Sequence, residues 1–129
     1  MINNCNLKLT SFNDDELYSI MYKATHNGAF VSYIRGKYCP TVEAFFLEVS
    51  ASLRFPSYFR QNWAAFDECI TDLEWLKFTG LLIVVDDFDA IFKKEAEQDT
   101  CKQLLNKYLS IASEYWQSEN VPIDIYLNN

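Results

Sequence analysis

The chain has 129 residues, which suits a single domain, and half of them are hydrophobic, enough to build a core. Its net charge is -7 at pH 7. Phosphate backbones repel such a surface, so the charge argues against plain binding of DNA or RNA, although a mimic of nucleic acid would carry the same sign. The charge would steer a basic protein partner towards the chain.

Several bulk features concern the compartment and the cofactors. The first twelve residues, MINNCNLKLTSF, contain no basic region followed by an apolar run, so we expect no signal peptide. The longest strongly apolar run, Leu81–Val85, is far too short to cross a membrane. The four cysteines include no CxxC pair and the chain has one histidine, which argues against a zinc site. We therefore expect a cytoplasmic protein with free thiols and no cofactor.

The beginning of the chain differs in character from the rest. Residues 1–28 are expected to form an N-terminal extension, and residues 29–129 the main domain. Within the extension, LKLTSF has the composition of a short strand. Asn13, followed three residues later by Glu16, has the spacing of a capping box and predicts a helix from Asp14 to His26.

The next part of the chain reads as a strand followed by two helices. The run FVSYI predicts a strand at Phe30–Ile34. Thr41 is a good N-cap, and the helix that it begins is ended by Pro56. A turn or short helical segment is expected at Ser57–Asn62, and a second helix at Trp63–Leu73.

The C-terminal half continues this alternation. The run LLIVV at Leu81–Val85 suits a strand that is covered on both faces. A short helix could begin at Ala90–Lys94, a longer helix is predicted at Thr100–Trp116, and a closing strand at Ile123–Leu127. Strands separated by helices predict an α/β fold with a small three-stranded parallel sheet packed with helices, to which the N-terminal segment could add.

The predicted helix at 63–73 sorts its side chains onto two faces. Its apolar residues share helical spacing and form a core stripe: Trp63, Phe66, Ile70 and Leu73. The opposite face carries Ala64, Asp67, Glu68 and Thr71. Tyr58 lies just before the helix and could flank that second face. Spacing alone favours an ordinary solvated helix surface, because a few acids on a helix are common.

The segment PSYFRQNWAAFDECITDLEW resembles the barstar family, the intracellular inhibitors of secreted bacterial ribonucleases of the barnase type. The matching positions are Pro56, Tyr58, Phe59, Asn62, Trp63, Ala65, Asp67, Cys69, Asp72, Leu73 and Trp75. The resemblance extends more weakly upstream to VSYIRGKY and downstream through LLIVVDDFD to PIDIYL, so that it covers roughly residues 30–127. It implies a barstar-like fold.

The resemblance also implies a function and a set of binding residues. In barstar, this helix and the segment before it plug the ribonuclease active site, and carboxylates take the place of substrate phosphates. Carried over by position, the implied partner-binding residues are Tyr58, Asn62, Ala64, Asp67, Glu68, Thr71 and Glu114. Glu68 stands at the key acidic position. Two residues depart from the family pattern: Ala64 replaces a usual aspartate and Arg60 replaces a usual glycine.

Three functions follow from these observations. The first is a non-catalytic inhibitor, an immunity protein whose partner is a basic, secreted or contact-delivered ribonuclease toxin, with no nucleic acid or membrane bound. The second is a barstar-like protein that binds another toxin or basic protein. The third is a metal-dependent enzyme that uses Asp86, Asp87 and Asp89 at the end of a strand. No nucleophile or phosphate loop accompanies these aspartates, so we favour a non-enzyme.

Overall fold

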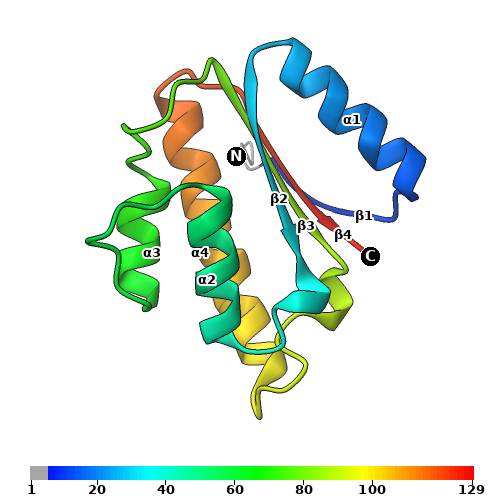
Figure 1. The fold of residues 1–129 in the computed structure, drawn as a ribbon, viewed down its shortest axis with the longest axis vertical. Helices are drawn as coiled ribbons and strands as arrows, with labels where there is room; N and C mark the ends of the chain where they lie inside the picture. Colours follow the sequence, from blue (N-terminus) through cyan, green and yellow to red (C-terminus); the bar gives the residue numbers. More distant parts are fainter. Residues whose placement is uncertain (1–5) are drawn as a thin grey trace, which may run out of the picture.

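The computed structural model describes residues 6–129; the predicted free thiol of Cys5 lies outside them. Four strands alternate with helices along the chain (Figure 1). In order, the elements are β1 (Leu7–Thr10), α1 (Asp14–His26), β2 (Ala29–Arg35), η1 (Gly36–Tyr38), α2 (Val42–Ser52), α3 (Trp63–Ile70), β3 (Gly80–Asp86), η2 (Phe88–Ala90), α4 (Gln98–Ser118) and β4 (Ile123–Asn128).

The strands form one sheet in which all neighbours are parallel, in the order β1-β4-β3-β2. The centre of the sheet is β3, where Ile83 is aligned with Ser32 of β2 and with Ile125 of β4. The predicted parallel α/β fold is confirmed. The N-terminal segment adds a fourth strand, because β1 pairs with β4 and aligns Leu7 with Ile125.

Helices cover both faces of this sheet. Helix α1 lies on one face, and α2, α3 and α4 lie on the other (Figure 1). The strand β3 is buried along its whole length. Its Leu81, Ile83 and Val85 belong to the large core beneath α2 and α4, whereas Leu82 and Val84 belong to a smaller core with Leu17 of α1. The double coverage predicted for LLIVV is therefore confirmed.

Aromatic rings fill the large core where α2 meets α3. The ring of Phe45 lies 5.6 Å from that of Phe66 and 5.8 Å from that of Phe92, in both cases edge to face. Such pairs add to the burial energy because the positive edge of one ring meets the negative face of another. Cys39 and Cys69 are buried nearby as free thiols, as expected from the sequence.

Two local predictions were wrong. The helix α3 ends at Ile70 rather than at Leu73. Thr71 follows it, with its hydroxyl donating to the Asp67 carbonyl at 2.7 Å, and Leu73 takes a left-handed backbone with a φ of 50°. At 90–94 there is no short helix: η2 ends at Ala90, and Phe92 has a φ of 61°, which an α-helix does not contain.

Within residues 6–129, no helix is long and apolar enough to cross a membrane.

Candidate protein-binding surface

The start of α3 is fixed by its own sequence. Asn62 has an extended backbone, and its side-chain oxygen accepts a hydrogen bond from the Ala65 amide at 2.8 Å. This cap satisfies one of the amides that the first turn of a helix leaves free. Asn62 is itself exposed, but its Oδ1 is already engaged in holding the helix. Its first role is therefore to set the direction in which α3 begins.

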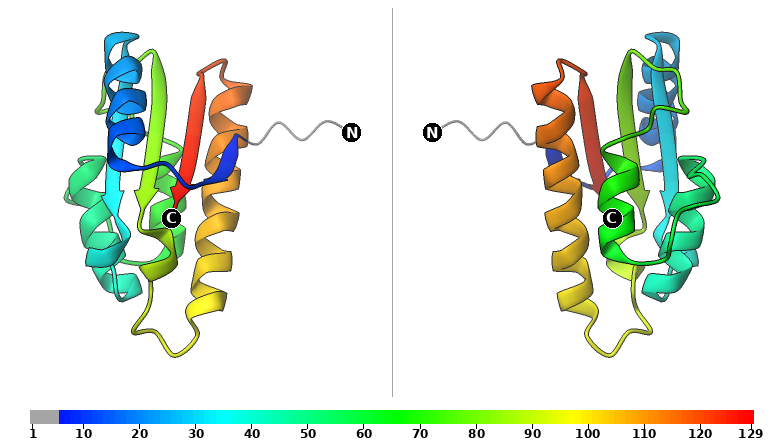
Figure 2. Two further views of the ribbon diagram at one scale, coloured as in Figure 1. Left: turned by 90° about the vertical axis from the view of Figure 1, so that its right-hand side faces the viewer. Right: turned by 90° about the vertical axis from the view of Figure 1, so that its left-hand side faces the viewer.

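Side chains of α4 hold both ends of α3. At the N-terminal end, the rings of Trp63 and Tyr108 stack with their planes 4° apart and their centroids 5.6 Å apart. At the other end, the indole Nε1 of Trp116 donates a buried hydrogen bond to the Ile70 carbonyl at 2.8 Å. Figure 2 shows α3 between α2 and α4 on this face of the sheet. The helix is thus a fixed support for whatever its outer face displays.

The two predicted faces of α3 are present. Phe66, Ile70 and Leu73 are buried, as the core stripe requires. On the other face, Ala64 and Glu68 are exposed, and Asp67 and Thr71 are half-buried. These four residues follow the spacing i, i+3, i+4, i+7, so three of them lie on one stripe of the helix, and Thr71 continues it just past the helix end.

Asp67 has an unusual environment within this surface. One of its carboxylate oxygens, Oδ1, is buried and has no hydrogen-bond partner in the described part of the chain. Burying a carboxylate oxygen without a donor is costly. Helical spacing does not reveal this environment, because only the packing around α3 decides which carboxylate oxygen is covered.

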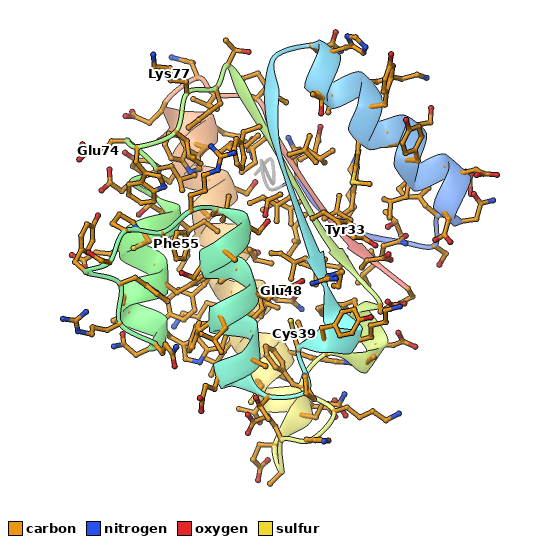
Figure 3. All side chains as sticks on the ribbon, in the orientation of Figure 1. Tyr33, Cys39, Glu48, Phe55, Glu74 and Lys77 are labelled. Carbon is orange, nitrogen blue, oxygen red and sulfur yellow. The ribbon has the colours of Figure 1, made fainter. Side chains whose placement is uncertain are left out.

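Tyr58 projects from the turn before α3 and is 58% exposed. Partial desolvation raises the pKa of its hydroxyl, and the negative charges of Asp72 and Glu74 add to this effect. Tyr58 therefore lies beside the C-terminal end of α3 and the loop that follows it. Figure 3 shows Glu74 at the outer edge of this region. An aromatic ring and several carboxylates thus share one side of the molecule.

Arg60 replaces the glycine that the family pattern has in this turn, and the structure shows where its side chain goes. The guanidinium Nη1 folds back over the turn and donates to the carbonyls of Ser57 (3.4 Å), Tyr58 (3.2 Å) and Phe59 (3.4 Å). The side chain therefore braces the segment that carries Tyr58. It also adds bulk and one positive charge next to the acidic surface.

Glu114 is exposed on α4. At about 100° per residue it is turned roughly 120° around the helix axis from Tyr108, which stacks on α3. Tyr115 lies within roughly 20° of Tyr108 on the same basis. It is 39% exposed, and its ring packs edge-on against Trp116 at 5.0 Å. Tyr115 therefore shares the side of α4 that carries Tyr108, which sequence reasoning missed. The partner-binding role of Glu114 stays a prediction.

Asp86, the last residue of β3, has its carboxylate engaged in hydrogen bonds within the protein. Asp86 accepts hydrogen bonds from the Tyr33 hydroxyl (2.6 Å), from Asn128 Nδ2 (3.0 Å) and from the Asp87 amide (3.0 Å). Burial alone would raise the pKa of Asp86, but these three donors outweigh it and hold that pKa below its ordinary value. Among residues 6–129, no three His, Cys, Asp or Glu side chains gather as a metal-binding group.

These features describe a small parallel α/β protein that displays acids and a tyrosine on a firmly held helix. The family model for Barstar (barnase inhibitor) matches residues 29–128, and the chain belongs to this family. Proteins of the family are non-catalytic inhibitors and are typically intracellular. Membership suggests a role as an inhibitor of barnase or a similar ribonuclease. No curated protein matches the chain closely enough to count as a relative.

Proposed function

We propose that the chain is an immunity protein that blocks the basic active site of a ribonuclease with the outer face of α3. The observation that carries this proposal is Glu68, an exposed carboxylate on a helix whose two ends are fixed to α4. Because the helix backbone under Glu68 is already fixed, only the side chain has to be ordered on binding, so more of its interaction energy remains as affinity. A ribonuclease active site, which binds phosphate, presents the cations that such a group would meet.

The proposed binding residues play different roles. Glu68 would take the place of a substrate phosphate, and Asp67, which is half-buried beside it, would add a second carboxylate to the same surface. Tyr58 would supply apolar contact, as exposed aromatic residues commonly do at the centre of interfaces. Thr71 would contact the rim of the partner's active site. Asn62 would act through its cap, and Ala64 would leave room without adding charge.

The proposed partner is a secreted or contact-delivered ribonuclease toxin, met in the cytoplasm of the cell that makes the inhibitor. The net charge of -7 supports this, because opposite charges raise the rate of encounter with a basic enzyme. A protein that inhibits a toxin benefits from rapid capture, since each free toxin molecule can turn over many substrates. Neither nucleic acid nor a membrane is required.

A second candidate is another basic toxin or protein that accepts the same acidic helix. Two residues favour it over a barnase-type enzyme. Ala64 removes a carboxylate from the middle of the stripe, and the Arg60 side chain covers the turn where the family has a glycine. Both changes alter the charge and shape that a partner would meet. A cleft with one fewer cation, or with an acid opposite Arg60, would fit this surface better.

The decisive experiment measures association and dissociation rates of the wild type and the Glu68→Ala variant against a barnase-type ribonuclease and a panel of other basic toxins. Removing one partner of a desolvated charge pair should cost about 2–5 kcal/mol, or roughly 30-fold to several thousand-fold in Kd, mainly through faster dissociation. This range comes from charge pairs in other complexes, the barnase–barstar complex of the same family among them.

The matched control is Asp15→Ala, which removes the same charge from an exposed site on α1, on the other side of the sheet. It should slow association slightly and leave dissociation unchanged. If Glu68→Ala is folded and binds each partner as the wild type does, the acids of α3 are only a solvated surface. Binding of a basic toxin but not of the ribonuclease would select the second candidate.

A further inference from the structure

A row of bonded polar side chains crosses the sheet on the face that α1 covers. Each strand contributes one residue near its carboxyl end: Tyr33 from β2, Asp86 from β3, Asn128 from β4 and Thr10 from β1. The Tyr33 hydroxyl and Asn128 Nδ2 both donate to Asp86, at 2.6 and 3.0 Å. The Thr10 hydroxyl donates to Asn128 Oδ1 at 2.8 Å. Polar groups at the carboxyl ends of parallel strands are well placed to contact ligands.

A cleft of about 630 Å³ lies over this row, between the sheet and the N-terminal end of α1. Its volume is in the range of sites for small molecules or single side chains. Three tyrosines and three acids make up much of its lining: Tyr18, Tyr33, Tyr38, Asp14, Asp86 and Asp87. Figure 3 shows Tyr33 on the side of β2 that faces α1.

The charges around the cleft do not balance. Arg35 and Lys37 are the basic residues of the lining. The Arg35 guanidinium is already paired with Glu48 of α2 at 2.9 Å. That leaves Lys37, whose amine lies 5.3 Å from the centre of the Tyr38 ring, to face three carboxylates. The cleft therefore carries excess negative charge.

Asp86 sharpens this imbalance. It is only 9% exposed, and within residues 6–129 it forms no ion pair with a lysine, arginine or histidine. Burial raises the pKa of the nearby Tyr33 hydroxyl, and the bond to Asp86 and the charges of Asp86, Asp87 and Asp14 raise it further. All three acids thus act on one hydroxyl group. The three donors to Asp86 and the nearby charge of Lys37 hold its pKa low, so the carboxylate stays charged and adds to the negative potential that a cation in the cleft would meet.

We propose that this cleft binds a small organic cation, an ammonium or guanidinium group on a short apolar stem. Asp14 and Asp87 would contact the charge at the mouth, above the carboxylate of Asp86. The rings of Tyr18 and Tyr33 would cover the stem and attract the cation through their faces, because Arg35 and Lys37 already lie over the Tyr38 ring, at 4.5 and 5.3 Å from its centre. The source is either a free amine or the basic side chain of a partner protein, since both carry the same group.

Other ligand classes fit less well. The carboxylate oxygens of Asp86 already accept hydrogen bonds from three protein donors. Among the described residues, no three His, Cys, Asp or Glu side chains gather to bind a metal, so a divalent ion would lack ligands here. An anion would meet Asp14, Asp15 and Glu16 in the first turn of α1. That turn is moreover closed by its own capping box, in which the Glu16 amide donates to Asn13.

Two features constrain the backbone of the loops around the cleft. Asp87 has a left-handed backbone with a φ of 48°. Gly36 sits so close to the carbonyls of Asp86 and Asp87 that a side chain there would clash with them. Because these backbones are fixed before binding, ordering them adds no further cost. The cleft lies on the opposite side of the sheet from α3, so this proposal does not depend on the proposed function.

The test is titration calorimetry at low salt with butylammonium and butylguanidinium ions, with inorganic phosphate and Mg²⁺ as competing probes. A second arm uses a short, end-blocked peptide that contains one arginine. We expect saturable one-to-one binding of at least one cation, weakened by salt, with NMR shift changes at Tyr33 and at the Asn128 side-chain amide. Binding of the free ions identifies a small amine as the source, and binding of the peptide alone identifies a partner side chain.

Two variants locate the site. Asp14→Asn should weaken binding about two- to fivefold, the range for an exposed charge pair. Asp87→Asn should weaken it at least as much, and asparagine tolerates the left-handed backbone there. The matched control is Asp15→Asn, which removes a neighbouring charge from the same helix turn but lies outside the lining, and should change binding less than about twofold. The proposal fails if no cation saturates, if phosphate or Mg²⁺ binds more tightly, or if Asp15→Asn weakens binding as much as Asp14→Asn.

Discussion

The hydrogen bond from Trp116 to the end of α3 gives a quantitative prediction about stability. In the variant Trp116→Phe, the Ile70 carbonyl loses the indole donor that it holds at 2.8 Å. Trp116 is only 8% exposed, so water has little access to the carbonyl that is left behind. An unsatisfied buried acceptor costs about 1–3 kcal/mol, and the smaller ring leaves a void worth about 1 kcal/mol more.

Together these effects should lower the free energy of unfolding by about 2–4 kcal/mol. For a chain of this length that corresponds to a fall in Tm of roughly 7–15 °C. Urea unfolding followed by far-UV circular dichroism measures the loss, and an unchanged m-value shows that the transition remains comparable. A loss below about 1 kcal/mol would refute the reasoning, because it would mean that the bond and the ring do not anchor α3.

Trp75→Phe is the matched control for this prediction. The indole of Trp75 also donates to a backbone carbonyl, that of Leu53, at 2.9 Å. Trp75 is half-buried, however, so water can replace the lost donor more easily. We expect a loss smaller than that of Trp116→Phe. Equal losses would show that burial does not govern the cost in this domain.

Two further predictions concern the loops beside the cleft. In Gly36→Ala, the new Cβ would lie 2.6 Å from the Asp86 carbonyl oxygen and closer still to that of Asp87. Thermal melts should show that the free energy of unfolding falls by about 1–3 kcal/mol. In the control Gly80→Ala, the nearest atom to the new Cβ lies at 3.3 Å, and the free energy of unfolding should change by no more than about 1 kcal/mol. The lowered pKa of Asp86 contributes stability that is complete above the ordinary aspartate pKa of about 3.9 and is lost as the pH falls through the lower pKa of the folded state. In Asp86→Asn the free energy of unfolding should therefore depend less steeply on pH in the acid range. An unchanged slope would contradict this.

The sequence predicted most of the fold because the relevant signals are local. The capping box at the start of α1 forms as expected, with the Glu16 amide donating to Asn13 and the Asn13 amide donating to Glu16. The Thr41 cap of α2 also forms, and its hydroxyl oxygen accepts from the Ala44 amide. The run LLIVV signalled a strand with both faces covered, since no polar residue interrupts it. Each of these signals lies within a few neighbouring residues.

The errors and omissions have a different origin. The early end of α3 depends on the Thr71 hydroxyl and on the left-handed backbone at Leu73, which helical spacing does not reveal. The bonds between Asp86, Tyr33 and Asn128 join residues 53 and 42 positions apart in the chain. No periodicity encodes such pairs, because they exist only once the strands are aligned in the sheet. The cleft was therefore invisible until the fold was known.

The candidate surface on α3 falls between these cases. Helical spacing correctly separated a core stripe from an outer face, and the burial of Phe66 and Ile70 shows this. The same spacing could not distinguish a binding surface from a solvated one, because both carry exposed acids. The resemblance to the barstar family suggested the function, and the match over residues 29–128 shows the family. The exposed Glu68 fits that function but does not test it.

The N-terminal extension contributes residues to the cleft but not to the surface on α3. The family match begins at residue 29, so β1 and α1 lie outside it. They are nevertheless integral to the fold, since Leu17 of α1 is buried against Leu82 and Val84 of the central strand. The surface on α3 is formed wholly by residues of the matched region, whereas the cleft needs Asp14 from the extension. Changes in the extension can therefore alter what the cleft binds while the residues of α3 and their anchors on α4 stay the same.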